Sequence, residues 1–245
     1  RLTDALMGAT NTLSTGTTNA ISTDDVFDSL DSDGFTVGTH GDSNQSGITY
    51  VAWNWLAGNA TLGTGDFTQG SVASTCRRNV DTGFSIVNFT ATGSAGTVGH
   101  GLSKAPELII TKATSDSGTI WATYYGDNTA SMTLHNTSSR AANILRWNNT
   151  TPTATLISFG AGWGTDSSGS LNGEAMVAYC FHSVDGYSKI GGRYAYATGN
   201  VGYIGNGSAD GTFVYTGFRP AYVMIKRTDS TSNWNIQDTK RATYN

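Results

Sequence analysis

The sequence predicts an all-β protein built from tandem antiparallel β-sandwich modules. Short segments alternate large and small side chains with a period of two, as half-buried strands do. Turn signals rich in glycine separate these segments, and the 245 residues include 31 Gly but only 3 Pro. The chain also repeats itself at spacings of 114 and 126 residues. Its organisation is therefore best interpreted on the scale of a repeated module.

Two sets of anchors define the repeat. Residues 106–112 align without a gap on residues 220–226, and Gly93-Ser94-Ala95 lies the same 114 residues before Gly207-Ser208-Ala209. A second pair, residues 51–55 and 177–181, is offset by 126 residues. Several anchors at fixed spacing are typical of a tandem array of one structural unit.

The expected elements are short strands. Alternation predicts strands at 50–55, 84–89 and 213–215, whereas continuous apolar runs predict fully buried strands at 108–110 and 222–225. Residues 140–145 form at most one helical turn. Strands that recur every ~8 to 12 residues, without a strong helical segment, are typical of an antiparallel sandwich.

Following the repeat along the chain gives four segments. Residues 1–58 match the second half of a module, 59–82 are a linker or long loop, 83–185 form a complete central module, and 186–245 match the first half of a third module. A half module exposes unpaired strand edges, which favours aggregation. We therefore expect the missing halves to lie beyond both ends of this chain. The alternative is that the first and last segments complete each other in space.

Composition excludes several partners. Charged residues make up 13% of the chain, against ~25% in typical soluble domains, and the net charge is -4 at pH 7 without a basic stripe. Nucleic acid is therefore not an expected partner. No apolar run approaches the ~18 residues of a membrane span. Cys76 and Cys180 occupy non-equivalent repeat positions, so we expect two independent thiols rather than a disulfide.

One acidic cluster offers ligands for a cation. Five aspartates lie within ten residues, and Asp28, Asp31 and Asp33 are the candidate Ca²⁺ ligands. The spacing departs from the EF-hand pattern because no acidic residue stands at the twelfth position. We favour a solvated turn, in which Asp33-Gly34 reverses the chain before a strand at Phe35. No other cofactor is expected.

The sequence shows no catalytic constellation, and we do not expect an enzyme. The only glutamates, Glu107 and Glu174, belong to opposite ends of a module, whereas glycoside hydrolysis needs two acids that face one cleft. The histidines lack zinc-ligand spacing, and the second and fourth of them are expected at turns or on the surface: His40, His100, His135 and His182.

The tryptophans divide by whether they recur. Trp121 and Trp234 occupy one repeat position, and Trp53 and Trp55 align with aromatic residues, which indicates core packing. Trp163 has no repeat partner and follows a Gly-rich loop. It is therefore the candidate ligand-binding residue, with an indole able to stack on a sugar ring.

Several motifs together resemble a known family. The longest motif runs from Gly205 to Pro220, and the shorter ones include Ser32–Gly38, Tyr50–Trp55, Val98–Leu102 and Gly186–Lys189. Across nearly the whole chain, they resemble a repeated module of large virion proteins in tailed bacteriophages, especially marine ones. The resemblance implies a jelly-roll sandwich of the concanavalin or laminin-G type without catalytic residues. Asn54 replaces the family's usual Cys, and residues 193–201 are an insertion, so no ligand site is transferred.

The resemblance also implies a function. A structural or adhesive component of the virion is expected, in a tail fibre or similar appendage on the surface of the extracellular particle. The expected partners are copies of itself, for example in a homotrimer, other virion proteins and host surface glycans. Two alternatives stay open: a polysaccharide depolymerase (glycoside hydrolase) of a tail spike, and a capsid decoration protein built from the same module.

Overall fold

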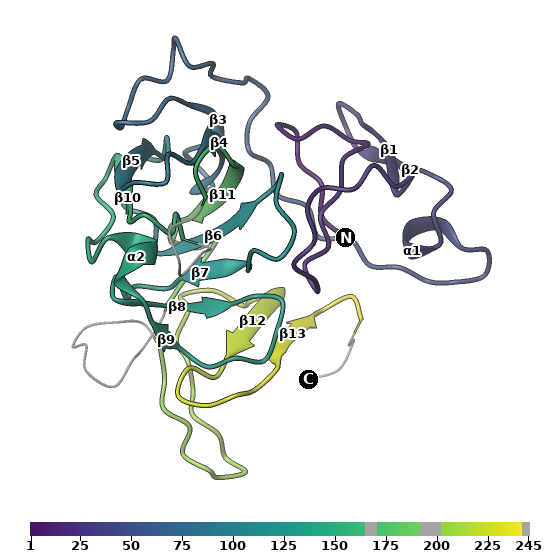
Figure 1. Cartoon of the computed structure of the whole chain (residues 1–245). Helices are drawn as coiled ribbons and strands as arrows, with labels where there is room; N and C mark the ends of the chain where they lie inside the picture. Colours follow the sequence, from purple (N-terminus) through teal and green to yellow (C-terminus); the bar gives the residue numbers. More distant parts are fainter. Residues whose placement is uncertain (165–170, 192–201, 242–245) are drawn as a thin grey trace.

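A seven-stranded antiparallel sheet forms the centre of the computed structural model, which describes residues 1–164, 171–191 and 202–241 (Figure 1). Its strand order is β3-β4-β11-β6-β7-β8-β9. The strands are β3 (Ser74–Asn79), β4 (Phe84–Thr90), β6 (Leu108–Ala113), β7 (Ala122–Tyr124), β8 (Ala130–Thr133), β9 (Ala141–Ala142) and β11 (Ala175–Phe181).

The predicted all-β class is confirmed. Within the described residues the only helices are single turns of four residues, α1 (Gly41–Asn44) and α2 (Ile144–Trp147). No helix in that part of the chain is long and apolar enough to cross a membrane. The helical turn expected around residues 140–145 is thus present, but it lies slightly later in the sequence.

Strand β11 lies between β4 and β6 and joins the two parts of the sheet. It pairs along its whole length with β4, from Ala175↔Thr90 to Phe181↔Phe84, and its other edge pairs with β6. Successive side chains of a strand point to opposite faces. Ala178 and Cys180 accordingly enter one core, whereas Val177 and Tyr179 enter a second core on the other face.

A second layer covers the first face. Strands β5 (Gly96–Gly99) and β10 (Leu156–Phe159) pair with each other, and their apolar side chains pack on the central sheet. Phe159 is the centre of an aromatic group, since its ring lies 5.4 Å from both Phe89 and Trp163. Burial of such large rings supplies much of the hydrophobic stabilisation of this face.

The amino-terminal segment covers the opposite face. In Figure 1 its purple trace runs beside β6 and β7. Leu13 is completely buried there with Trp121 and Tyr179, and the Tyr179 hydroxyl donates a 2.6 Å hydrogen bond to the Asp4 carboxylate. The first residues of the predicted first module therefore pack as part of the central unit.

Two hairpins flank the central sheet. One consists of β1 (Phe27–Leu30) and β2 (Phe35–Val37), and the other of β12 (Tyr222–Lys226) and β13 (Trp234–Asp238). The second hairpin has the register of β6 and β7. Val223 lies opposite Gln237, as Ile109 lies opposite Tyr124. The sequence repeat is thus also a repeat of backbone pairing.

Several predicted elements differ from the structure. The stretch expected to be a linker, 59–82, contains the edge strand β3, which was missed because its inward side chains at Ser74 and Cys76 are small and give little hydrophobic signal. Residues 50–55 and 213–215 form no strand. Strand β12 alternates between half-buried and exposed side chains instead of being fully buried, since no second layer covers it among the described residues.

Both histidines expected at turns or on the surface are in fact buried, His100 completely and His182 almost so. His100 accepts a hydrogen bond from the Leu102 amide at Nδ1, so its Nε2–H donates to the Thr153 carbonyl at 3.1 Å. Burial lowers the pKa of this imidazole to about 4, more than the bond to Thr153 raises it, and His182 lowers it further. His100 is therefore neutral in the folded chain. The expected cysteine state is confirmed, because Cys76 and Cys180 are free and buried.

The burial of His100 predicts that the folded chain is less stable in acid. The unfolded chain protonates the His100 imidazole near its ordinary pKa of about 6.5, whereas the folded chain resists protonation down to about 4. We expect the free energy of unfolding to fall as pH drops through this window, by at most about 1.4 kcal/mol per pH unit from this residue. Urea unfolding of the wild type and His100→Gln across the window measures the difference, since Gln retains a donor. Identical pH slopes for the two proteins would contradict the assignment.

Candidate functional site

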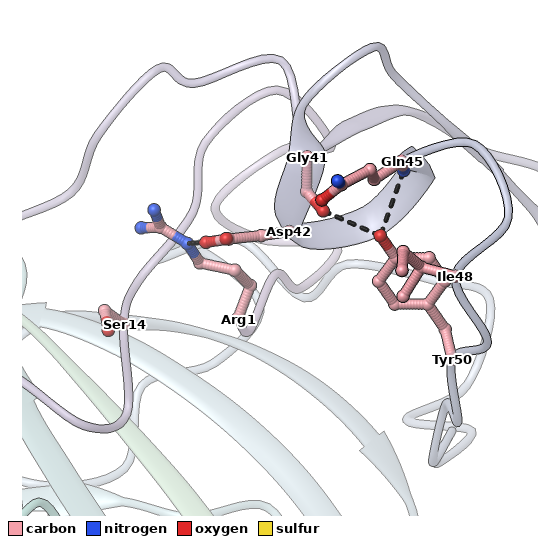
Figure 2. Close-up of a pocket in the computed structure, with 7 residues that line it drawn as sticks. All are labelled: Arg1, Ser14, Gly41, Asp42, Gln45, Ile48 and Tyr50. Carbon is pink, nitrogen blue, oxygen red and sulfur yellow. Dashed lines mark hydrogen bonds and ion pairs between the residues drawn. The ribbon is translucent and has the colours of Figure 1, made fainter.

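One open, polar hollow lies beside the amino-terminal segment (Figure 2). Arg1 donates from Nε to Asp42 at 2.7 Å, and its guanidinium also lies 3.4 Å from Asp24. The Tyr50 hydroxyl donates to the Gly41 carbonyl at 2.7 Å and accepts from the Gln45 amide at 2.9 Å. These polar groups are engaged with one another, and the arrangement holds the α1 turn in place. It shows no nucleophile beside a base.

The aspartates proposed as Ca²⁺ ligands lie in a hairpin turn. Asp28 is exposed on β1, Asp31 accepts from the Thr36 hydroxyl at 3.1 Å, and Asp33 is exposed at the turn. Across residues 1–164, 171–191 and 202–241, no group of three His, Cys, Asp or Glu side chains comes together to hold a metal. The Asp33-Gly34 reversal before β2 does form, as the turn interpretation predicts.

Trp163 lies in the core beneath β5 and β10. Its indole is completely buried and stacks on Phe159, and its backbone has a positive φ of 45°. Contact with a sugar would require the ring to leave this core. The Gly-rich loop therefore positions a core residue, and the missing repeat partner of Trp163 reflects a packing feature of the central unit.

The two glutamates are held far apart. Glu107 precedes β6 and accepts a hydrogen bond from the Ser183 amide, whereas Glu174 precedes β11 and accepts from the Ser115 hydroxyl. Because β6 and β11 are antiparallel, their first residues lie at opposite ends of the sheet. Seven residues of strand separate the two acids by roughly 20 Å. Paired glycosidase acids lie about 5 to 10 Å apart, so these two do not form such a pair.

The most specific geometry in the chain is a contact that occurs twice. Residues 14–21 dock on the loop between β6 and β7, and residues 133–140 dock on the loop between β12 and β13. Each contact includes three corresponding hydrogen bonds. The first set is Ile21 N to Thr114 O (2.9 Å), Gly118 N to Thr18 O (3.0 Å) and Trp121 Nε1 to Ser14 O (3.1 Å). The second set is Arg140 N to Thr228 O (2.9 Å), Ser232 N to Thr137 O (2.9 Å) and Trp234 Nε1 to Thr133 O (2.9 Å).

The two contacts keep a constant spacing. The docking residues Ser14, Thr18 and Ile21 all lie 119 residues before their counterparts, and the loop residues lie 113 or 114 residues before theirs. We name the segments 14–21 and 133–140 the docking segments, and the loops that they bind the receiving loops. The same interface therefore joins successive copies of the repeat.

A lysine organises each receiving loop. Lys112 is completely buried and donates from Nζ to the Ala113 carbonyl at 2.7 Å, to Asp116 O at 3.0 Å and to the Thr119 hydroxyl at 2.6 Å. Its counterpart Lys226 donates to the Arg227 carbonyl at 2.7 Å. Burial lowers the pKa of Lys112 to about 8 despite the opposing influence of Asp116. These bonds fix the carbonyls that shape the loop.

Two aspartates hold similar turns, one near each end of the chain. Asp4 accepts the Leu6 and Met7 amides at 2.8 Å, and Asp238 accepts the Lys240 and Arg241 amides at 2.9 Å. Both aspartates are nearly buried. The second carboxylate oxygen binds Tyr179 in the first case and Arg241 in the second. Residues 4–7 and 238–241 thus form turns that are held in the same way.

Comparison with known proteins identifies the family. All 245 residues match a family described as a domain of unknown function, DUF7483. The chain belongs to this family. No curated protein and no solved structure matches it.

Sequence reasoning missed the docking segments of this DUF7483 chain. The docking segments form most of their hydrogen bonds through backbone atoms. Their amino-acid sequences can therefore differ, and few residue types are the same in 14–21 and 133–140. The signal in the sequence is the recurrence of Trp121 as Trp234, which by itself indicates only core packing. Trp121 is indeed completely buried, and its indole N–H also joins one copy of the repeat to the next.

The indole bond can be tested by substitution. Trp121→Phe removes a donor that serves the carbonyls of Ser14 and Thr17, and it leaves both acceptors without that partner. We expect it to lower the free energy of unfolding by about 1 to 2 kcal/mol more than Trp163→Phe. Trp163 is the matched control because it is equally buried and its Nε1 has no hydrogen-bond partner within the described residues.

Urea unfolding gives the energies, and limited proteolysis reports release of residues 1–24. Equal losses of stability with no change in cleavage would show that the docking bond contributes nothing beyond the buried ring.

Proposed function

We propose that this chain is a structural and adhesive component of a phage virion, in a tail fibre or similar appendage on the particle surface. Its modules are β-sandwiches of the jelly-roll, concanavalin or laminin-G-like type. The observation that carries the proposal is the docking contact used twice. An interface that repeats from one module to the next is what a modular array requires.

The chemistry of this interface suits a modular array. Its hydrogen bonds are largely between backbone atoms, so they tolerate divergence of side chains between modules. They are also insensitive to salt compared with surface ion pairs. With 13% charged residues, the surface relies on hydroxyl and amide groups, which can contact host glycans through hydrogen bonds.

Self-association is part of the proposal. Strand β3 is an edge of the central sheet, and its Arg77 and Arg78 place charge there, which discourages uncontrolled strand pairing. A symmetric homo-oligomer such as a trimer protects such edges in a defined way. Other virion proteins are the remaining partners.

The two alternatives differ in what supports them. A depolymerase needs a pair of acids, and the separation of Glu107 and Glu174 gives that pair no support. Asp166, a further acid near the Gly-rich loop, lies outside the described residues, as does the insertion at 193–201. A capsid decoration protein would use the same rigid module, so only its position on the particle distinguishes it from a fibre.

Labelling of virions tests the proposal. Antibodies raised against the recombinant chain, carrying gold, are expected to mark the appendages of intact particles in electron micrographs, and mass spectrometry of purified virions is expected to detect the chain. Pre-immune antibodies are the control. Gold spread over the capsid would instead support a decoration protein, and absence from purified virions would refute a virion role.

An activity assay addresses the enzyme alternative. We expect the purified chain to release no reducing ends from host polysaccharide. Release that disappears in Glu174→Gln or Asp166→Asn would replace the structural proposal with a depolymerase.

A further inference from the structure

Two distant segments expose an unusual amount of apolar surface. Of the 18 large apolar side chains that are exposed in the described part of the chain, 13 come from residues 48–56 and 203–225. Exposed apolar clusters of this kind mark contact surfaces. The two segments are the ones that the sequence repeat assigns to incomplete modules.

Their counterparts in the central unit are buried. Val223 is 37% exposed, whereas its counterpart Ile109 is 0% exposed. Trp53 is likewise 37% exposed, and its counterpart Tyr179 only 5%. In the central unit this burial depends on β11, which lies between β4 and β6. Strand β12 is the counterpart of β6, and β13 is its only strand partner among the described residues.

The counterpart of β11 already lies beside β12. The Tyr222 ring is 5.7 Å from the Trp53 ring and 6.0 Å from the Trp55 ring, both edge-to-face. The Arg241 guanidinium, just beyond β13, stacks 4.9 Å from the centre of the Trp53 ring. Trp55 also lies 6.4 Å from Phe181, which ties this segment to the end of β11.

The register of these contacts agrees with the repeat. In the central sheet Phe181 lies opposite Leu108. Phe181 corresponds to Trp55 at the 126-residue spacing, and Leu108 corresponds to Tyr222 at the 114-residue spacing. The rings of Trp55 and Tyr222 are in contact. The ring contact was not used to define the spacings, so it is an independent observation.

The ring contacts bring residues 51–55 to β12, although no backbone hydrogen bond joins these two segments, both of which the structure describes. We infer that residues 51–55 complete this approach in solution and pair with β12 as an antiparallel strand, so that the first and last segments of one chain build a second sheet. In this register Val51 lies opposite Lys226, as Val177 lies opposite Lys112. The occupant of the free edge of β12 is a segment of the same chain, because Ala57 is buried in the core of the central unit and Trp55 contacts Phe181, which anchors this segment next to β12. This is the alternative in which the first and last segments complete each other in space.

A cross-strand disulfide tests the register. Val51→Cys/Lys226→Cys should form an intrachain disulfide under mild oxidation, at least tenfold faster than Val51→Cys/Ile225→Cys. Adjacent strand residues point to opposite faces, so the control pair lacks the required geometry. The native thiols do not compete because burial raises the pKa of Cys76 to about 12 and that of Cys180 further. Peptide mapping of monomer-sized product identifies the bond.

Hydrogen exchange on the unmodified chain gives a second measurement that does not depend on variants folding. Amides of residues 51–55 should exchange more slowly than those of the exposed turn at 31–34. Equal disulfide rates in the two double variants, disulfide-linked dimers that increase with concentration, or exchange at 51–55 as fast as in the turn would each overturn the inference. Dimers would identify a second copy as the occupant. The outcome is independent of whether the chain is found on virions.

Discussion

The double pairing of β11 is the constraint on which the rest of the structure depends. This strand is the last of the central unit in sequence, yet it pairs with β4 on one edge and β6 on the other. Its alternating side chains fill two cores, one beneath β5 and β10 and one beneath the amino-terminal segment. Such long-range pairing costs loop-closure entropy, and the burial of both faces of the strand offsets that cost.

The docking contact shows how a repeat can preserve geometry while its sequence diverges. A buried lysine holds the carbonyls of the first receiving loop, and backbone atoms of the docking segment complete most of the hydrogen bonds. Only the tryptophan supplies a side-chain donor in both copies. Interactions between backbone groups place few demands on residue type, which explains why Trp121 and Trp234 are evident in the sequence while their partner segments are not.

The polar groups described above mostly hold the fold together. The groups of the hollow near Arg1 are bound to one another, and the two glutamates lie at opposite ends of the sheet. Within the described residues, two corresponding sets of hydrogen bonds join a docking segment to a receiving loop. If the outer segments also complete a sheet, the chain contains two related units held by the same kinds of contact.

The sequence by itself determined the all-β class, strands at 84–89 and 108–110, the reversal at Asp33-Gly34 and the spacing of the repeat, because alternation, turn chemistry and recurrence can be recognised without knowing which segments meet. Only the tertiary structure decided which segments meet. It placed Trp163 and His100 in the core, turned part of an expected linker into β3, and laid residues 1–22 on the central sheet. These outcomes depend on contacts between residues distant in the sequence, from 15 positions for Ser74 and Phe89 to 175 positions for Asp4 and Tyr179. No local pattern specifies the partner that a strand or a tryptophan will find.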